Sequence, residues 1–561
     1  MTHDACDALL IGGGHNGLVC AAYLARAGFK VTLLERRDVV GGAAVTEEFH
    51  PGFRNSVAAY TVSLLQPKVI ADLELARHGL NIVRRRLNNV LPLPDGRYLA
   101  VGAGRTREEV AKFSARDAQR LADYERRLDA LADVLRAAVL EPPPNVTEGG
   151  WLKALPELLR AGRLGRRIKA LDANLRTDLL DLFAISAGEY LDRFFESAPI
   201  KAVFGFDGIV GHYASPYTPG SAYVLLHHVF GEVDGVKGAW GHALGGMGAI
   251  TQAMAKSAQA AGAVIRTGCG VRKVIVERAG SGPHRAVGVV TEKGETLRAR
   301  CVIANVNPKR LYEQLLDADV VPAPTRERMA NWRCGSGTFR MNVALSELPR
   351  FRALPEPGDH LTAGIIIAPS LDYMDRAYTD ARAHGWSRAP IVELLIPSTL
   401  DDSLAPPGRH VASLFCQHVA PVLPDGKSWD DHREEVADLM IATVDAYAPG
   451  FKACVLGRQI LSPLDLERDF GLLGGDIFHG ALSLNQLFSA RPMLGQADYR
   501  GALPGLYVCG AGTHPGGGVT GAPGHNAARA VIADLRFHQK RLLKRAQAPL
   551  GRAHQTLHRR L

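Results

Sequence analysis

Short apolar runs alternate with glycine turns and amphipathic stretches near the start of the chain. Residues 7–11 (Asp-Ala-Leu-Leu-Ile) predict a buried strand, and residues 31–34 predict a second one. Apolar residues at helical spacing lie between them and predict a helix that ends at Gly28, because glycine is favoured just past a helix C-terminus. This strand–helix–strand order is typical of an α/β fold with a parallel sheet.

Other regions of the chain show related patterns. Residues 245–277 predict a glycine turn, a helix and two strands. Residues 506–509 predict a strand that runs into a glycine-dense loop, and a helix is expected from about 522 to 535. Between these regions, residues 105–200 have helical spacing, whereas residues 335–460 mix β-rich runs with a helix. The two long intervening regions are therefore expected to form a structural unit separate from the strand–helix regions.

The loop after the first strand has the spacing of a dinucleotide-binding turn. Gly12, Gly14 and Gly17 form GxGxxG immediately before the helix. In this motif the glycines allow a tight turn, a close approach of the backbone to a pyrophosphate, and close packing of helix on strand. The pyrophosphate lies at the helix N-terminus, where free N–H groups and the dipole favour anions. Glu35 ends the second strand where an acid binds ribose hydroxyls, which argues against a 2′-phosphate.

Two more glycine clusters support the same kind of site. Gly41 and Gly42 stand just beyond the second strand, and paired glycines let backbone N–H groups approach an anion or a flat ring. The loop from Gly510 to Gly521 leads directly into a helix, whose N-terminus can stabilise the anion formed when a flavin is reduced. Taken alone, the first cluster could be a plain loop and the second a linker.

The motif GAGTHPGGG, together with the early GxGxxG and the glycine pair, resembles the signatures of bacterial-type phytoene desaturases. These belong to the wider group of FAD-dependent amine oxidases and carotenoid/retinoid oxidoreductases. The resemblance runs from Asp7 to about Ala533. It implies FAD as the cofactor, contacted by Gly12, Gly14, Gly17, Glu35, Arg37, Gly41, Gly42, Val271, Gly510 and Val519.

The resemblance also implies a fold class: α/β, with a discontinuous Rossmann-like FAD-binding domain and an inserted α+β substrate domain made of a mixed sheet and a helical cap. The expected segments are 1–75, 240–320 and 495–535 for the FAD-binding domain, 76–239 for the helical cap, 321–494 for the substrate-domain sheet and 536–561 for a basic tail. Many relatives have arginine directly after the glycine pair, where this chain has Ala43. One contact to phosphate or flavin is therefore missing from the expected set.

No motif places a catalytic base. His479 and His514 lie inside matched motifs and are candidates to face the flavin, although a histidine bonded to loop backbone is the commoner case. Flavin chemistry requires the protein mainly to orient the substrate and tune electrostatics, with a base for the accompanying proton. The catalytic residues are therefore left unassigned.

Composition excludes several classes of protein. The chain has 561 residues, of which 47% are hydrophobic and 22% are charged, as in ordinary globular proteins. No apolar run approaches the length that crosses a bilayer, and the N-terminus leads straight into a strand without a targeting segment. Eight scattered cysteines without a CxxC pair argue against a disulfide scaffold, a zinc site and a dithiol centre. A cytoplasmic enzyme with reduced thiols and no metal is expected, and a disulfide reductase with bound NADPH is disfavoured.

The formal net charge of +9 is concentrated at one end. Eight bases and no acid follow Asp534, which leaves the rest of the chain close to neutral. Leucines are interspersed among these bases, and a basic stretch of this kind can lie on anionic lipid. A solvated, partly helical tail is the commoner outcome. Contact with the inner face of a membrane is thus one of two interpretations, and no nucleic-acid partner is expected.

The leading functional hypothesis is an FAD-dependent oxidoreductase that dehydrogenates, saturates or isomerises a lipophilic unsaturated substrate. It rests on the three-part FAD signature and on two insertions long enough to enclose a cavity. The electron acceptor is expected to be oxygen or a quinone. Two alternatives remain: a flavin amine oxidase, and a flavin-binding interaction protein with little turnover.

Overall fold

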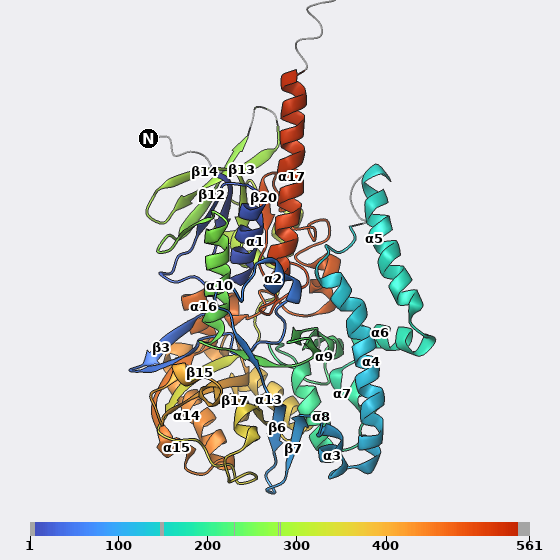
Figure 1. Ribbon diagram of the computed structural model, residues 1–561, viewed down its shortest axis with the longest axis vertical. Helices are drawn as coiled ribbons and strands as arrows, with labels where there is room; N and C mark the ends of the chain where they lie inside the picture. Colours follow the sequence, from blue (N-terminus) through green and yellow to red (C-terminus); the bar gives the residue numbers. More distant parts are fainter. Residues whose placement is uncertain (1–5, 146–150, 229, 279, 281, 548–561) are drawn as a thin grey trace, which may run out of the picture.

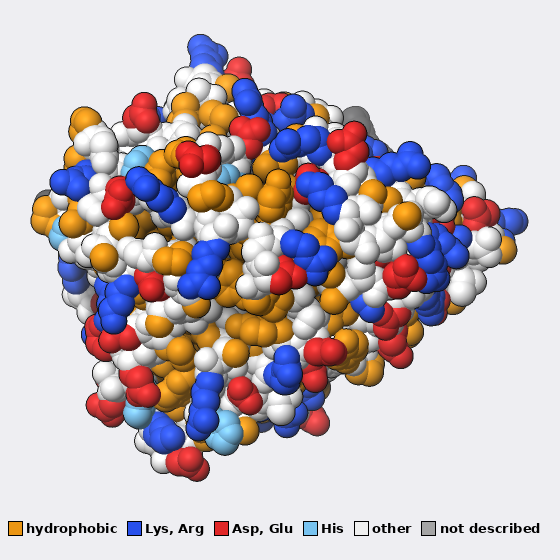
Figure 2. All heavy atoms as spheres, turned by 90° about the horizontal axis from the view of Figure 1, so that it is seen from below, with side chains coloured by type: hydrophobic (Ala, Val, Ile, Leu, Met, Phe, Trp, Pro, Cys, Tyr) orange, Lys and Arg blue, Asp and Glu red, His pale blue; other side chains and the backbone are white. Residues whose placement is uncertain are grey.

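Two sheets and a group of helices make up the protein (Figure 1). The structure, a computed structural model, describes residues 6–547 apart from 146–150, 229, 279 and 281. Within this part, no helix is both long and apolar enough to cross a membrane. Seen from the end that carries the second sheet, basic and acidic side chains are interspersed among apolar ones (Figure 2).

The first sheet has a parallel core in the order β11-β2-β1-β14-β20. Two antiparallel strands, β13 and β12, continue from the first half of β14. The strands are β1 (Cys6–Ile11), β2 (Val31–Leu34), β11 (Val264–Arg266), β12 (Val271–Arg278), β13 (His284–Thr291), β14 (Thr296–Ala304) and β20 (Leu506–Val508). The chain thus returns to this sheet twice after leaving it, so the expected discontinuous FAD-binding fold is confirmed.

Helix α1 (His15–Arg26) packs against both α10 (Met247–Ala260) and α17 (Ala522–Gln547). Its inward face is fully buried, because apolar residues recur at helical spacing. Contact with α17 is close because Gly524 has no side chain: a Cβ there would lie 2.2 Å from the carbonyl oxygen of Asn16. Helix α17 continues past residue 535 and takes the first part of the expected basic tail into its last turns.

The second sheet is mixed, in the order β19-β15-β18-β17-β16-β6-β7, with β6 and β16 parallel. Its strands are β6 (Leu87–Pro92), β7 (Tyr98–Gly102), β15 (Phe339–Leu345), β16 (Gly364–Ile367), β17 (Trp386–Leu395), β18 (His410–Val419) and β19 (Val455–Leu461). Helices α13 (Leu371–His384) and α14 (Trp429–Tyr447) pack against it. β6 and β7 belong to this sheet although they fall in the segment expected to be helical; the segment boundaries themselves stay predictions.

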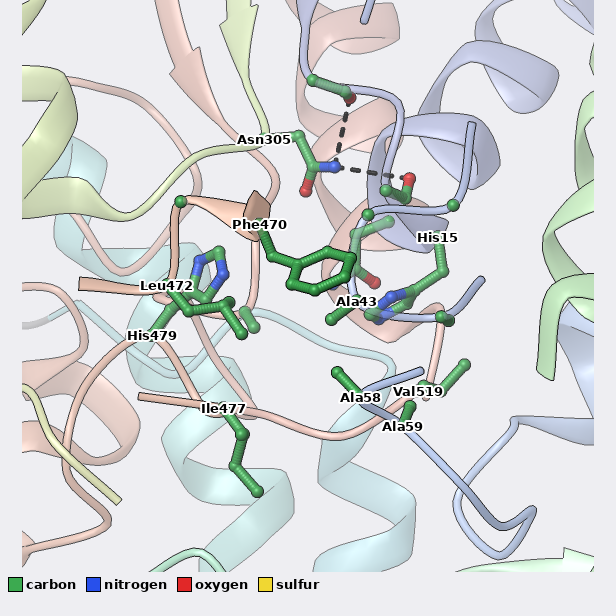
Figure 3. A pocket seen from close by; sticks show the side chains of 18 of the residues that line it. His15, Ala43, Ala58, Ala59, Asn305, Phe470, Leu472, Ile477, His479 and Val519 are labelled. Carbon is green, nitrogen blue, oxygen red and sulfur yellow. Dashed lines mark hydrogen bonds between the residues drawn. The ribbon is translucent and has the colours of Figure 1, made fainter. Parts of the chain in front are cut away.

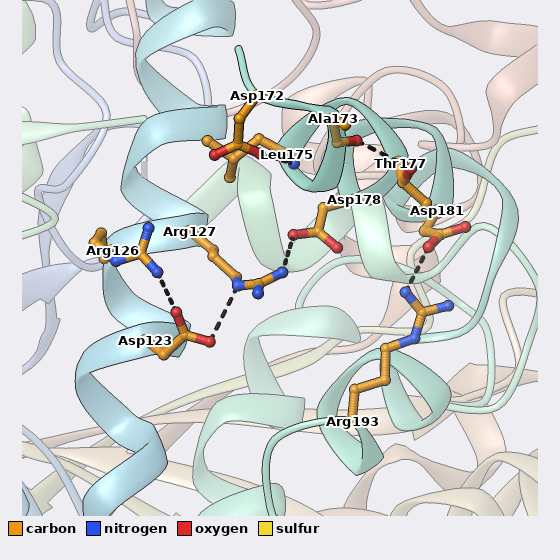
Figure 4. Close-up of polar contacts among 10 residues, drawn as sticks. All are labelled: Asp123, Arg126, Arg127, Asp172, Ala173, Leu175, Thr177, Asp178, Asp181 and Arg193. Atoms are coloured by element: carbon orange, nitrogen blue, oxygen red, sulfur yellow. Dashed lines mark hydrogen bonds and ion pairs between the residues drawn. The ribbon is translucent and has the colours of Figure 1, made fainter.

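A third layer consists of helices on one flank of the molecule (Figure 1). They are α3 (Thr106–Ala111), α4 (Ala115–Val139), α5 (Trp151–Ala170), α6 (Ala173–Ala184), α7 (Ala187–Asp192), α8 (Ala198–Gly205) and α9 (Ala222–His228). Arg127 of α4 ties two of them together: its guanidinium contacts Asp123 on its own helix at 3.1 Å and Asp178 of α6 at 2.9 Å (Figure 4). One large apolar cluster fills the space between these helices and the second sheet.

Shorter elements connect these layers. They are the hairpin β3 (Thr46–His50) and β4 (Phe53–Ser56), the pairs β5 (Ile82–Arg84) with β10 (Gly241–Ala243) and β8 (Glu232–Val233) with β9 (Val236–Lys237), and the helices α2 (Pro67–Asp72), α11 (Pro308–Gln314), α12 (Ala323–Ala330), α15 (Phe451–Cys454) and α16 (Pro463–Phe470). Eight further segments of the described part of the chain are short 3₁₀ turns.

Candidate cofactor and active site

A cavity lies where the carboxyl ends of the parallel strands meet the second sheet. In open α/β sheets this is the edge at which ligands bind. Its walls come from segments far apart in the chain, among them residues 11–16, 34–44, 58–64, 470–479 and 518–519 (Figure 3). The ends of β1, β2 and β14 all contribute to the lining, so the sheet topology itself assembles the site.

The glycine loop after β1 leaves the N-terminus of α1 open to the cavity. Gly12 has a φ of 97°, and Gly14 at the N-cap has no side chain to bond the first N–H groups of the helix. The first turn of α1 contains no acidic residue, so its N–H groups and dipole are available to an anion. Gly17 is not in the lining: a Cβ there would lie 2.3 Å from the carbonyl oxygen of Gly12, so it serves the close packing of α1 on the loop.

Asn305, which the sequence did not single out, fixes the shape of this loop. It follows β14 directly and its Nδ2 group donates to the carbonyl oxygens of Gly12 (3.2 Å) and Gly14 (3.3 Å), as Figure 3 shows. The sequence offers one signal for this role: an asparagine stands directly after the strand that leads out of the sheet.

Glu35 lies at the end of β2 with its buried carboxylate in the cavity wall. Oε2 accepts a hydrogen bond from the N–H of Gly13 (2.7 Å), and Oε1 accepts one from the N–H of Arg37 (2.9 Å). The carboxylate is thereby held between the glycine loop and the following turn, the position that the sequence predicted for an acid that binds ribose.

The glycine pair lies against the first glycine loop. The N–H of Gly41 donates to the carbonyl of Gly13 (2.8 Å), and a Cβ on Gly42 would come within 3.2 Å of the Gly14 Cα atom. Both glycines have positive φ, 130° and 57°, which non-glycine residues rarely adopt. Arg37 also lines the cavity, where its guanidinium contacts Glu47 (2.5 Å). Ala43 is part of the same wall and adds no charge to it.

Val271 and Val519 both line the cavity, from β12 and from the C-terminal glycine loop. Gly510 does not: it packs beside Asn305, whose Oδ1 atom would be 3.3 Å from a Cβ at this position. Eight of the ten residues named for FAD therefore lie around one cavity, and Gly17 and Gly510 support its loops from behind. Their contacts with the cofactor stay predictions.

The two candidate histidines differ in position. His479 lines the cavity and its Nδ1 atom is buried without a partner among the described residues. His514 is not part of the lining, and its Nε2 atom is 3.2 Å from the carbonyl of Ala138. His15, at the first turn of α1, also lines the cavity. Burial lowers the pKa of each of these histidines to about 4, so each imidazole is neutral near pH 7.

Arg491 holds the loop with His479 against the C-terminal glycine loop. Its fully buried guanidinium donates to the carbonyls of Phe478 (2.7 Å), Gln486 (2.9 Å) and Ala511 (2.9 Å). Burial lowers the pKa of Arg491 to about 10, so it stays charged at neutral pH. The Arg491 cation thus joins two segments of the cavity wall, the loop with His479 and the C-terminal glycine loop, that lie apart in the sequence.

At the end of the cavity formed with the second sheet, Tyr60 stacks on Phe415 of β18, with ring centroids 5.1 Å apart. Its hydroxyl donates to Glu393 of β17 at 2.5 Å. The guanidinium of Arg340, which has no exposed surface, lies 4.7 Å from the centre of the Tyr60 ring. Burial raises the pKa of Glu393, although Tyr60, Arg85 and Arg340 oppose the shift. No local pattern in the sequence predicts the contact between Tyr60 and Glu393.

Charge is distributed unevenly in the lining. Five charged residues line the cavity, and all come from the ends of the first sheet or the elements that follow it: Glu35, Arg36, Arg37, Glu292 and Arg310. Tyr60, Trp240 and Phe415 give the opposite end an aromatic and apolar character. Glycines without side chains, uncapped N–H groups on α1 and a fixed acid beside them fit the FAD that the motifs imply.

Comparison with known proteins places the chain among flavoenzymes. A family model described as "Flavin containing amine oxidoreductase" matches residues 17–368. The chain is 42% identical, over 94% of both chains, to pyridine nucleotide-disulfide oxidoreductase domain-containing protein 2 of Rattus norvegicus. All eight cysteines here are free thiols.

More distant relatives also match over nearly their full length. Identity is 25% to a subunit of the limonene dehydrogenase of Castellaniella defragrans, covering 94% of this chain and 95% of that protein. It is again 25% to phytoene desaturase (lycopene-forming) of Pseudescherichia vulneris, covering 94% and 99%. A solved structure of putrescine oxidase bound to putrescine superimposes with a TM-score of 0.57 at 15% identity, over 95% of this chain and 99% of that one. That likeness concerns the fold.

Proposed function

The chain belongs to the family of flavin-containing amine oxidoreductases and is an FAD-dependent oxidoreductase, and from this premise we propose that its substrate is a lipophilic, unsaturated molecule. The reaction passes hydride between a substrate carbon and FAD, in a dehydrogenation, a saturation or an isomerisation. The observation that carries the proposal is the uncharged, aromatic end of the cavity, which offers no ionic partner to a charged substrate. Two relatives are named for reactions of unsaturated hydrocarbons, limonene and phytoene.

FAD, when bound, supplies the electron-accepting ring. The chain's own contribution begins with binding: Glu35, the N–H groups of α1 and the backbone of Gly41 and Gly42 would hold the dinucleotide. Tyr60 and Phe415 give the other end of the cavity a flat apolar wall against which an unsaturated chain can be oriented. Exclusion of water follows from the same apolar lining.

Tyr60 and Glu393 are suited to move the proton. When one carbon loses hydride, its neighbour must lose a proton for a double bond to form. The Tyr60 oxygen can accept that proton while its own O–H proton passes to the Glu393 carboxylate, 2.5 Å away. Burial raises the pKa of Glu393, which makes its carboxylate a stronger base than an exposed glutamate. In a saturation the same proton moves in the reverse direction.

A flavin amine oxidase is the second candidate. The aromatic side chains of Tyr60, Trp240 and Phe415 in one wall favour it, since aromatic rings can flank a neutral amine. The two candidates differ in which molecule reduces the flavin.

Product analysis separates them. FAD-loaded protein is incubated with limonene, a long polyene or a primary amine, in the presence of either a soluble quinone as electron acceptor or dithionite as electron donor. We expect a product that differs from the alkene by two hydrogens or by double-bond position, and we expect Tyr60→Phe to retain FAD while turning over about 10²-fold more slowly. Turnover of the amine alone would overturn the proposal in favour of the second candidate.

A further inference from the structure

Helix α5 exposes a row of leucines on the flank of the molecule. Leu155, Leu158 and Leu159 are 54%, 56% and 60% exposed, and their spacing of three and four places them on one face. The C-terminal end of the helix is anchored, because Ile168 and Leu171, the residue just after α5, pack against the large apolar cluster. The leucine face of the N-terminal half is therefore presented to the surroundings by a helix held at its other end.

Basic residues continue the leucine face. At 100° per residue, Arg166 and Lys169 follow the leucines on the same side of α5, whereas Arg167 lies about 100° round the helix from Arg166. These three bases have no acidic partner among the residues that the structure describes. The sole acid of the helix, Glu157, is 2.7 Å from Arg160. Exposed leucines next to unpaired bases are typical of helices that lie in a bilayer interface.

A second basic element projects at the same end of the molecule. Helix α17 extends past the body there, and the N-terminal, leucine-bearing half of α5 points toward that end (Figure 1). The exposed residues of α17 include Arg536 and Lys540, with Phe537 58% exposed between them. Stable interfacial binding takes two signals, an apolar insertion and a polybasic segment, and these two helices provide one of each.

We propose that α5 docks the protein on an anionic lipid bilayer, with Leu155, Leu158 and Leu159 inserted at the level of the headgroups and the basic end of α17 adding electrostatic attraction. The basic residues of α5 favour a lipid bilayer over a second copy of the chain as the binding partner. A second copy of the chain would bring the unpaired cations of two α5 helices together, which is unfavourable, whereas phosphate headgroups complement them. Because no described helix can span a bilayer, the contact is made at its surface.

Vesicle co-sedimentation of the FAD-loaded protein tests this docking. Vesicles of phosphatidylcholine alone are compared with vesicles that also contain phosphatidylglycerol. We expect preferential, salt-sensitive binding to the anionic vesicles, and about a tenfold loss of bound protein in L155S/L158S/L159S. The matched control, L180S/V422S/L456S, removes three exposed apolar side chains from other parts of the chain and should bind as the wild type does. FAD content and circular dichroism show that both variants are folded.

Three results would overturn the proposal. The first is equal binding of the wild type to both kinds of vesicle. The second is unchanged binding of the α5 variant, including the case in which only removal of residues 541–561 abolishes binding. The third is a wild-type dimer, detected by sedimentation velocity without lipid, that the α5 variant dissociates, since this would assign the leucine face to self-association.

Discussion

Glu35 shows how a single side chain shapes the cavity. Its two carboxylate oxygens accept hydrogen bonds from backbone N–H groups of Gly13 and Arg37, so Glu35 holds the glycine loop in place. The same carboxylate is expected to bind the ribose hydroxyls of FAD. Removal of the Glu35 side chain therefore has two effects: FAD loses a contact, and the glycine loop loses its hydrogen bond to the carboxylate. Hydrogen bonds to a charged acceptor are stronger than neutral ones.

Glu35→Ala is expected to weaken FAD binding by at least about tenfold, which corresponds to about 1.4 kcal/mol. Quenching of flavin fluorescence during titration measures the affinity. Glu48→Ala is the control, because Glu48 is exposed and outside the cavity lining. Equal affinities in the two variants would remove Glu35 from the site.

Asp207, in the 3₁₀ turn that follows α8, is expected to make the stability of the protein depend on pH. Burial raises its pKa to about 8, and Glu393 adds to the shift. Between about pH 4 and pH 8 the folded protein keeps a proton that the unfolded chain has released, so the free energy of unfolding falls as pH rises through this window. Asp207→Asn should flatten the decline in Tm between pH 5 and pH 8, whereas Asp319→Asn at the surface should not. Parallel Tm curves for wild type and Asp207→Asn would contradict this origin.

At the scale of elements, close approach of α1 to the loop after β1 depends on Gly17. Gly17→Ala would place a Cβ 2.3 Å from the carbonyl oxygen of Gly12 and 2.8 Å from Nδ2 of Asn305. We expect a loss of more than about 2 kcal/mol in the free energy of unfolding, together with loss of FAD. Gly162→Ala in α5 meets nothing within 4 Å and should be neutral or stabilising, because alanine favours helix. Denaturant unfolding of both variants checks this, and similar stabilities would refute the packing argument.

The helical layer depends on a bridge between α4 and α6. Arg127→Met leaves Asp178, whose side chain is 9% exposed, without its cation, and we expect a cost of about 1–3 kcal/mol. Arg126→Met removes a surface pair with Asp123 on the same helix and should cost less than about 0.5 kcal/mol. Urea unfolding distinguishes the two. If both variants were equally stable, the bridge between α4 and α6 would contribute nothing measurable.

Local patterns allowed five strands of the first sheet to be predicted, because each strand–loop–helix unit lies within a few tens of residues, whereas β13 and β14 were not predicted from such patterns. The predicted second strand, for example, coincides with β2. Partners distant in sequence could not be predicted in this way. Strand β6 joins the second sheet through β16, with Asn89 opposite Gly364. Tyr60 meets Glu393 across 333 positions, and no periodicity along the chain carries that contact.

For the whole molecule, the arrangement of the two sheets explains why one cavity has two characters. The first sheet supplies glycine loops and all the charged lining residues, and the second sheet closes the cavity with Phe415 and the aromatic residues beside it. The net charge of +9 belongs to neither wall, since its excess lies in the residues after Asp534. We therefore assign the excess charge to the proposed docking on lipid, and the uncharged end of the cavity to the proposed substrate.

Anaerobic mixing of the FAD-loaded protein with candidate substrates tests the proposed substrate class most directly, because it follows the cofactor in a single turnover. We predict that a lipophilic alkene either bleaches the visible absorption of oxidised flavin, as dehydrogenation requires, or restores it in flavin first reduced with dithionite, as saturation requires. Primary amines should do neither, and Tyr60→Phe should slow the change about 10²-fold without loss of FAD. Bleaching by amines alone, or an equal rate in Tyr60→Phe, would contradict the proposed substrate and the role of Tyr60.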